Sequence, residues 1–86
     1  MDTQRFIEIC KKLVKDYTIE HCDKTDCIPD FDVFVVWNCK TLQNNKALLS
    51  TTLFDGMYYE ITYNGNKNEI YFDAYKKFEN RCISVE

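Results

Sequence analysis

The sequence predicts an α+β fold in which an N-terminal amphipathic helix packs on an antiparallel meander of three to four strands, with a short C-terminal helix as an option. Apolar residues recur at intervals of three and four near the N-terminus, which is typical of one buried helix face. From residue 32 onward β-branched and aromatic residues dominate, and short segments rich in asparagine and glycine separate them, as in strands joined by turns. Because 86 residues have room for one core, we expect a single α+β domain over residues 1–86.

Asp2 or Thr3 can cap a helix that runs through QRFIEICKKLVKDYTIEH to His21. Its apolar stripe consists of residues at helical spacing, which are Phe6, Cys10, Leu13 and Tyr17, widened by Ile9 and Val14. Burial of this stripe should hold the helix, because each ion pair on its polar side adds only about 0.2–0.5 kcal/mol. Charged and short polar residues follow as far as Asp30, and together with the only proline, Pro29, they predict a loop.

The segment Asp32–Leu42, DVFVVWNCKTL, predicts the first strand because it is dense in β-branched and aromatic residues. Strict alternation places Val33, Val35, Trp37 and Cys39 on one face and Phe34 and Val36 on the other. Gln43–Asn45 supplies turn residues. Lys46–Phe54 then predicts a returning strand, with a short helix over Ala47–Leu49 as the alternative.

Two aromatic runs on either side of Asn64–Asn68 predict a β-hairpin, and Asp55–Gly56 predicts the tight turn before it. In the first run, the residues expected in the core are Met57, Tyr59, Ile61 and Tyr63. The second run offers Ile70, Phe72 and Ala74 to the same core, with Tyr71, Asp73 and Tyr75 on the opposite face. We expect this strand to end near Tyr75, and residues 74–84 fit either a short helix or a further extended segment.

The net charge of −3 and the pI near 5.1 disfavour binding to nucleic acid or to anionic membranes. No run approaches the roughly 20 apolar residues of a membrane span, and the N-terminal residues lack the pattern of a secretion signal. Five cysteines stand at irregular spacing, so we expect reduced thiols rather than a disulfide framework. These observations predict a cytoplasmic protein whose partner is another protein.

Sequence motifs for catalysis are absent: there is no G-x-S-x-G, H-E-x-x-H, Walker or dinucleotide glycine motif. We therefore expect no enzymatic activity and no cofactor. A zinc site at His21, Cys22, Cys27 and Cys39 is the main metal alternative, but its cysteines lack paired C-x₂-C spacing. The acidic residues between 23 and 32 lack the order of a calcium-binding loop. His21 and Cys22 are adjacent and should point in different directions, so we predict neither a metal site nor a nucleophilic pair.

The candidate partner contacts are Phe34, Tyr58, Tyr71, Asp73 and Tyr75. Three of them are tyrosines that share a face away from the expected core, and tyrosine is enriched at interfaces because it combines a large apolar area with a polar tip. This surplus of aromatic residues predicts a non-enzymatic binding protein. If a C-terminal helix covered that face, the same residues would instead be packed inside the monomer. The alternative functions are a self-associating dimer or assembly component and a single-stranded nucleic-acid binder.

Residues 32–53, DVFVVWNCKTLQNNKALLSTTL, and residues 55–80, DGMYYEITYNGNKNEIYFDAYKKFEN, resemble a small family of uncharacterised proteins encoded by phages and prophages of Gram-positive bacteria. The amphipathic N-terminal helix completes the resemblance, which covers most of the chain. It implies a phage protein that works in the cytoplasm of a bacterial host and modulates or inhibits a host protein of the defence, repair or transcription machinery. The function of the family is unknown, so the resemblance assigns no catalytic or binding residues.

Overall fold

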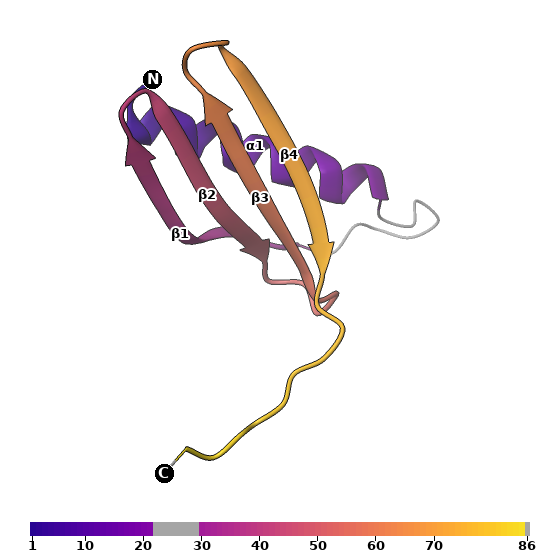
Figure 1. The fold of residues 1–86 in the computed structure, drawn as a ribbon. Helices are drawn as coiled ribbons and strands as arrows, with labels where there is room; N and C mark the ends of the chain where they lie inside the picture. Colours follow the sequence, from indigo (N-terminus) through magenta and orange to yellow (C-terminus); the bar gives the residue numbers. More distant parts are fainter. Residues whose placement is uncertain (22–29, 86) are drawn as a thin grey trace.

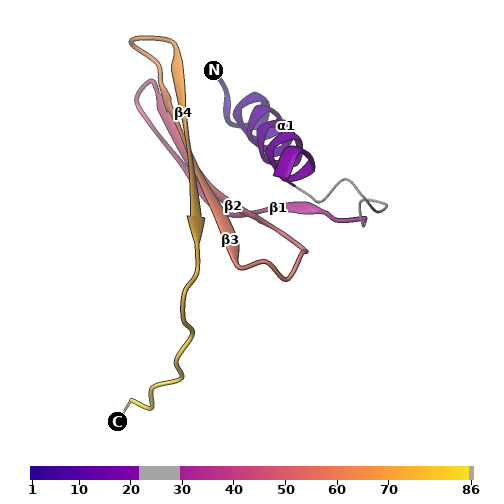
Figure 2. The ribbon, with the colours of Figure 1, turned by 90° about the vertical axis from the view of Figure 1, so that its right-hand side faces the viewer.

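One helix packs on one face of a four-stranded sheet, which confirms the predicted α+β fold (Figure 1). The computed structural model describes residues 1–21 and 30–85. The elements are α1 (Thr3–His21), β1 (Val33–Thr41), β2 (Asn44–Thr51), β3 (Met57–Asn64) and β4 (Glu69–Lys76). The strands form an antiparallel meander in the order β1-β2-β3-β4. Figure 2 shows α1 on one side of the sheet and no helix in the described part of the chain on the other.

Helix α1 begins at an acidic cap and ends at His21, as the sequence predicts. Between the two candidate caps the structure favours Asp2, whose Oδ1 accepts a hydrogen bond from the Arg5 backbone N–H at 2.8 Å. Ile9, predicted to widen the buried stripe, is partly buried but is not among the described residues that pack against the core, whereas Ile7 is. The helix therefore buries one continuous stripe, which is Phe6, Cys10, Val14 and Thr18.

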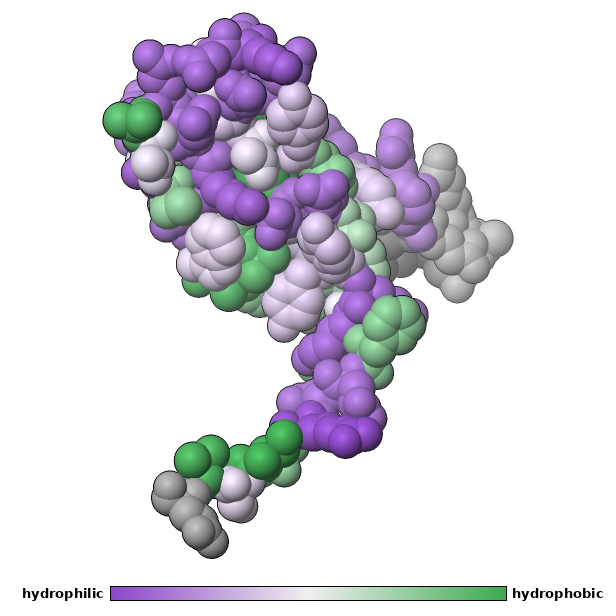
Figure 3. Space-filling model, viewed as in Figure 1, coloured by the Kyte–Doolittle hydropathy of each residue, from purple (hydrophilic) through white to green (hydrophobic). Residues whose placement is uncertain are grey.

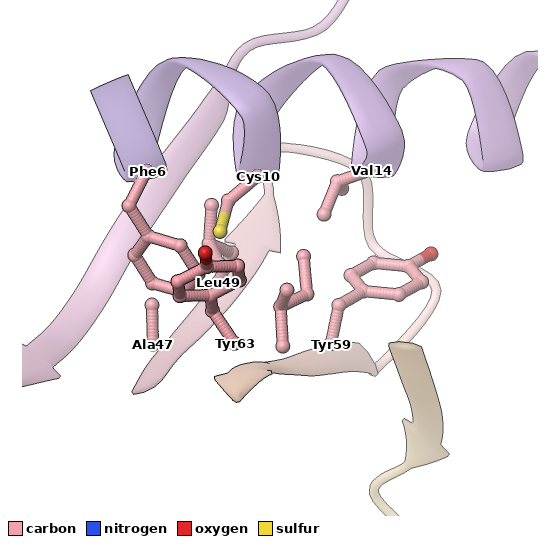
Figure 4. Packing of buried hydrophobic residues seen from close by; sticks show 8 residues of the cluster. Phe6, Cys10, Val14, Ala47, Leu49, Tyr59 and Tyr63 are labelled. Carbon is pink, nitrogen blue, oxygen red and sulfur yellow. The ribbon is translucent and has the colours of Figure 1, made fainter. Parts of the chain in front are cut away.

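The hydrophobic core lies between α1 and the middle strands (Figure 4). Its buried members are Phe6, Cys10, Val14, Ala47, Leu49, Tyr59, Ile61 and Tyr63. The alternation predicted for β3 is confirmed, since Tyr59, Ile61 and Tyr63 face the helix and Met57 packs against the same cluster. Helix α1 therefore covers one face of the sheet, and that face is apolar.

A β-bulge in β1 overturns the predicted faces of that strand. Val35 lies opposite Leu49, but the next residue with a partner is Trp37, opposite Leu48, so Val36 is an extra residue. An inserted residue reverses the alternation of everything after it. Trp37 and Cys39, predicted on the same face as Val33 and Val35, therefore lie on the face away from α1.

The connection between β1 and β2 is tighter than predicted. Thr41 pairs with Asn44, which leaves a two-residue turn at Leu42 and Gln43, with Leu42 at a φ of 57°. Asn44 and Asn45, predicted in the turn, belong to β2. The alternative of a short helix over Ala47–Leu49 is wrong, because both residues pair within the sheet.

Strand β2 ends at Thr51 rather than at Phe54 as predicted. The Thr51 hydroxyl accepts a hydrogen bond from the Leu53 N–H at 3.3 Å, which turns the backbone out of the strand. The predicted turn at Asp55 and Gly56 follows, and Gly56 has a φ of 71° that an L-residue rarely adopts. This short connection brings the chain back into β3.

Residues 77–85 form neither a helix nor a strand, so the optional C-terminal helix is not present. The segment leaves the end of β4 and runs away from the sheet in both views (Figures 1 and 2). It therefore does not cover the face of the sheet opposite α1.

Replacing Gly65 by alanine should lower the free energy of unfolding by about 1–3 kcal/mol. A β-carbon at Gly65 would lie 2.1 Å from the carbonyl oxygen of Gln43, so the β3–β4 turn could not keep its contact with the β1–β2 turn. That contact includes a hydrogen bond of 3.0 Å from the Gly65 N–H to Asn44 Oδ1. Urea denaturation of Gly65→Ala measures the loss. The matched control is Asn66→Ala, which is exposed in the same turn and should change stability by less than about 0.5 kcal/mol; equal effects would contradict the packing argument.

Candidate functional site

The open face of the sheet is the set of β-strand side chains that point away from α1. Strand pairing places them in rows that cross all four strands. The first row is Phe34, Ser50, Tyr58 and Tyr75, and the second is Trp37, Leu48, Glu60 and Asp73. The third row is Cys39, Lys46, Thr62 and Tyr71. The first two rows concentrate large apolar groups near the end of the sheet where the β2–β3 connection lies.

All five predicted contact residues lie on this open face. Phe34, Tyr58 and Tyr75 belong to its first row, Asp73 to the second and Tyr71 to the third. The side chains on the edge strands are the more exposed, with Tyr75 at 52% of its full accessibility, whereas Tyr58 is partly buried. The sheet therefore brings candidate contact residues from β1, β3 and β4 together on one surface.

Sequence reasoning missed Trp37 and Leu48. Alternation from Val33 assigned Trp37 to the core, but the bulge at Val36 turns it onto the open face, where it is 42% exposed. Leu48 lies directly opposite Trp37 and is partly buried beside it. The run of four β-branched or aromatic residues before Trp37 does not mark the bulge, so no sequence signal would have found it.

A hollow adjoins the first row at the end of the sheet. It has a volume of about 580 Å³, and its lining includes Phe34, Tyr58, Phe54 and Lys77. Ser50 lies between Phe34 and Tyr58 in the first row. It is nearly inaccessible, and its hydroxyl donates a hydrogen bond of 2.8 Å to the Met57 carbonyl. In Figure 3, which views this face, pale aromatic rings and apolar side chains gather over the lower part of the sheet and polar side chains over the upper part.

The charge on the open face is more acidic than basic. Lys46 forms an ion pair with Glu60 at 3.2 Å, which neutralises both groups. Asp73 lies beside Glu60 in the second row. The Tyr71 hydroxyl donates a hydrogen bond to the Glu69 carboxylate, and this bond together with the charge of Glu69 raises the pKa of Tyr71. The carboxylates of Glu60, Asp73 and Glu69 therefore lie beside the aromatic groups of the second and third rows.

The residues considered for zinc are not brought together where the structure describes them. His21 stacks on Tyr17 with 4.0 Å between ring centroids, and its Nδ1 lies 2.9 Å from the Tyr17 carbonyl on the helix side of the sheet. Cys39 lies on the open face, and Cys22 and Cys27 lie outside the described residues. Within residues 1–21 and 30–85, no three His, Cys, Asp or Glu side chains are grouped so that they could hold a metal ion.

The fold and the surface define a class of protein: a small α+β domain with one packed sheet face and one open, aromatic face. No helix in the described part of the chain is long and apolar enough to span a membrane. The chain belongs to the family of unknown function DUF6275, whose sequence profile matches residues 7–85. No curated protein and no solved structure shows significant similarity to it.

Proposed function

We propose that this protein is a phage-encoded, non-enzymatic binding protein that uses the open face to bind a protein of its bacterial host, and that it modulates or inhibits that protein in the host cytoplasm. The observation that carries the proposal is the number of aromatic groups on a face that α1 does not cover. The resemblance of residues 32–53 and 55–80 to phage and prophage proteins of Gram-positive bacteria supports the host context.

The composition of the open face is that of an interface centre. Trp and Tyr carry a large share of the binding free energy at protein interfaces because they bury much area while losing few rotamers. Trp37, Tyr58 and Tyr75 are within one row of each other, and Phe34 adds an exposed ring beside the hollow. Covering these groups would contribute a favourable binding free energy of roughly 25 cal/mol for each Å² of apolar surface removed from water. The open face is therefore expected to bind a partner that presents apolar side chains.

The charges favour a protein over a nucleic acid as that partner. A single strand of nucleic acid stacks on aromatic groups but also requires a basic surface along its phosphates. On the open face Lys46 is paired with Glu60. The further lysine beside the first row, Lys77, is outnumbered by the carboxylates of Asp73 and Glu69. Lys40 and Lys76 pair with Asn45 and Met57, residues on the helix side of the sheet, so they do not add to the open face.

Affinity capture from host lysate tests the proposal. Immobilised wild-type protein should retain a host protein that the double variant Trp37→Ala, Tyr58→Ala does not retain. A second double variant, Tyr71→Ala, Tyr75→Ala, should weaken retention. After the captured protein is purified, titration should show that removing a central ring costs about 2 kcal/mol or more, which is about 30-fold in Kd.

The matched control removes an exposed apolar side chain elsewhere. Leu42 is exposed in the β1–β2 turn, away from the aromatic rows, and Leu42→Ala should leave retention unchanged. Circular dichroism establishes that each variant keeps its secondary structure. Recovery of the same partners at equal strength by the wild type and by both double variants would contradict the proposal.

A further inference from the structure

The C-terminal arm, residues 77–85, lies outside the fold that carries it. The last backbone hydrogen bond between the arm and the rest of the described chain runs from the Lys77 N–H to the Gly56 carbonyl, at 2.7 Å. Beyond this point the arm is exposed, with Phe78 at 97% and Val85 at 91% of full accessibility, and Ile83 is also exposed. Three large apolar side chains on an extended segment are costly in water. The arm therefore has the composition of a segment that is covered in its working state.

The outer edge of β4 is a regular strand edge, whereas the outer edge of β1 is interrupted by a bulge. Strand β4 is last in the sheet and pairs with β3 in unbroken register from Glu69 to Lys76, and no other described residue pairs with it. Strand β1, the opposite edge, carries the bulge at Val36. Bulges disrupt edge-to-edge pairing, whereas a long regular edge invites it.

We propose that two copies of this chain form a dimer in which the arm of each copy pairs, antiparallel, with the β4 edge of the other. The lengths agree: an extended arm of nine residues spans about 30 Å at about 3.3 Å per residue, and the eight residues of β4 span about 26 Å. The arm leaves the end of β4 clear of the sheet (Figures 1 and 2), so pairing would extend β4 into one long strand from Glu69 to Val85. The pairing joins two four-stranded sheets into a single sheet.

Charge and side-chain alternation select the register. Glu79 and Arg81 form an ion pair at 3.1 Å, which places them on the same side of the extended arm. Residues separated by an even number share a face of a strand, so Arg81 belongs to the face that carries Asp73. In the antiparallel register that sets Asp73 opposite Arg81, Tyr71 lies opposite Ile83. This register gives one opposite-charge pair and one aromatic–aliphatic pair at each of the two symmetry-related sites. It also sets Lys77 opposite its own copy at the twofold axis, a single like-charge pair against two opposite-charge pairs.

The symmetry of the dimer has a consequence for the open face. Antiparallel pairing of two identical strands places the twofold axis perpendicular to the sheet. That axis leaves both open faces on the same side, so the dimer presents two aromatic surfaces side by side. The dimer does not depend on the proposed host partner: its backbone pairing involves the β4 edge and the arm, and the candidate contacts on the open face that this register sets opposite the arm are Tyr71, Asp73 and Tyr75.

Sedimentation equilibrium of the 86-residue chain, from low to high micromolar concentration, tests the proposal. The wild type should be a dimer. Arg81→Asp should shift the protein to monomer, as should Asp73→Arg, and the double variant that exchanges the two charges should restore the dimer. Lys67→Asp is the control, since it reverses an exposed charge in the β3–β4 turn and should not change the mass.

A second variant tests the backbone pairing. Neighbouring residues of a strand direct their N–H groups to opposite edges, so the pair Arg81→Pro, Cys82→Pro removes a donor whichever edge faces the partner. It should give a monomer with an unchanged fold, because no residue of the arm belongs to the hydrophobic core. A monomeric wild type at high micromolar concentration would overturn the proposal. So would a dimer that persists in the proline variant, and neither result would bear on host binding.

Discussion

Replacing Phe6 by alanine should lower the free energy of unfolding by about 3–5 kcal/mol. Phe6 is 1% exposed and fills the space between α1 and the sheet, next to Cys10 and Ala47 (Figure 4). The loss combines the transfer of a phenyl ring to water with the cavity left behind, which the surrounding strands cannot fill. Small domains have unfolding free energies of only about 5–15 kcal/mol, so this one substitution should remove a large part of the total.

Urea denaturation followed by circular dichroism measures the effect, and the chain supplies a matched control. Phe54 is fully exposed in the β2–β3 connection, and Phe54→Ala should change the free energy of unfolding by no more than about 0.5 kcal/mol. The two variants delete the same atoms and differ only in burial. If they unfolded at the same urea concentration, the core assigned to the α1 stripe would be wrong.

Much of this fold follows from periodicity alone. Spacings of three and four over Phe6, Cys10 and Val14 specify the helix and its buried stripe, and the alternation of Tyr59 with Tyr58 specifies which side of β3 faces it. These patterns predict the structure well because each is a property of one helix or strand that has one buried face and one face in water. The meander follows from the short connections between consecutive strands.

The errors arose where one residue changes the phase of a pattern. The bulge at Val36 moves Trp37 from the expected core face to the open face, and nothing in VFVVW distinguishes a bulged strand from a regular one. A bulge depends on the partner strand: Leu48 must pair with Trp37 rather than with Val36, the residue that would lie opposite it in a regular ladder. Information of that kind is carried by tertiary contacts, not by local sequence.

The C-terminal arm was ambiguous for a related reason. Phe78 and Cys82 stand four residues apart, which fits a helix, but a helix there would need an apolar surface to pack on. The open face offers such a surface, but the arm runs past the end of the sheet and does not lie across that face (Figures 1 and 2). Propensity alone could not decide between the two forms, because the decision depends on what lies beside the segment.

Raising the pH above 9 should destabilise the fold through Cys10. Its side chain is inaccessible to solvent, and burial raises the pKa of the Cys10 thiol from 9.0 to about 12, opposed weakly by a backbone hydrogen bond. Below pH 9 the thiol is protonated in both the folded and the unfolded chain, so its contribution is fully present. Between pH 9 and 12 the unfolded chain loses the proton and the folded chain keeps it. The free energy of unfolding should therefore fall by up to about 1.4 kcal/mol per pH unit.

Lysine and tyrosine side chains also titrate in this range, so the effect of Cys10 has to be isolated by a variant. Cys10→Ala keeps the stripe apolar and removes the thiol, and it should be less stable than the wild type near pH 7 because it leaves a small cavity. Since only the wild type carries the thiol, its stability relative to Cys10→Ala should fall as the pH rises from 9 to 12, and the order of the two stabilities should reverse once this loss exceeds the cost of the cavity. A difference that stays constant over that interval would mean that the thiol is not buried at the interface between α1 and the sheet, where the rest of the core depends on it.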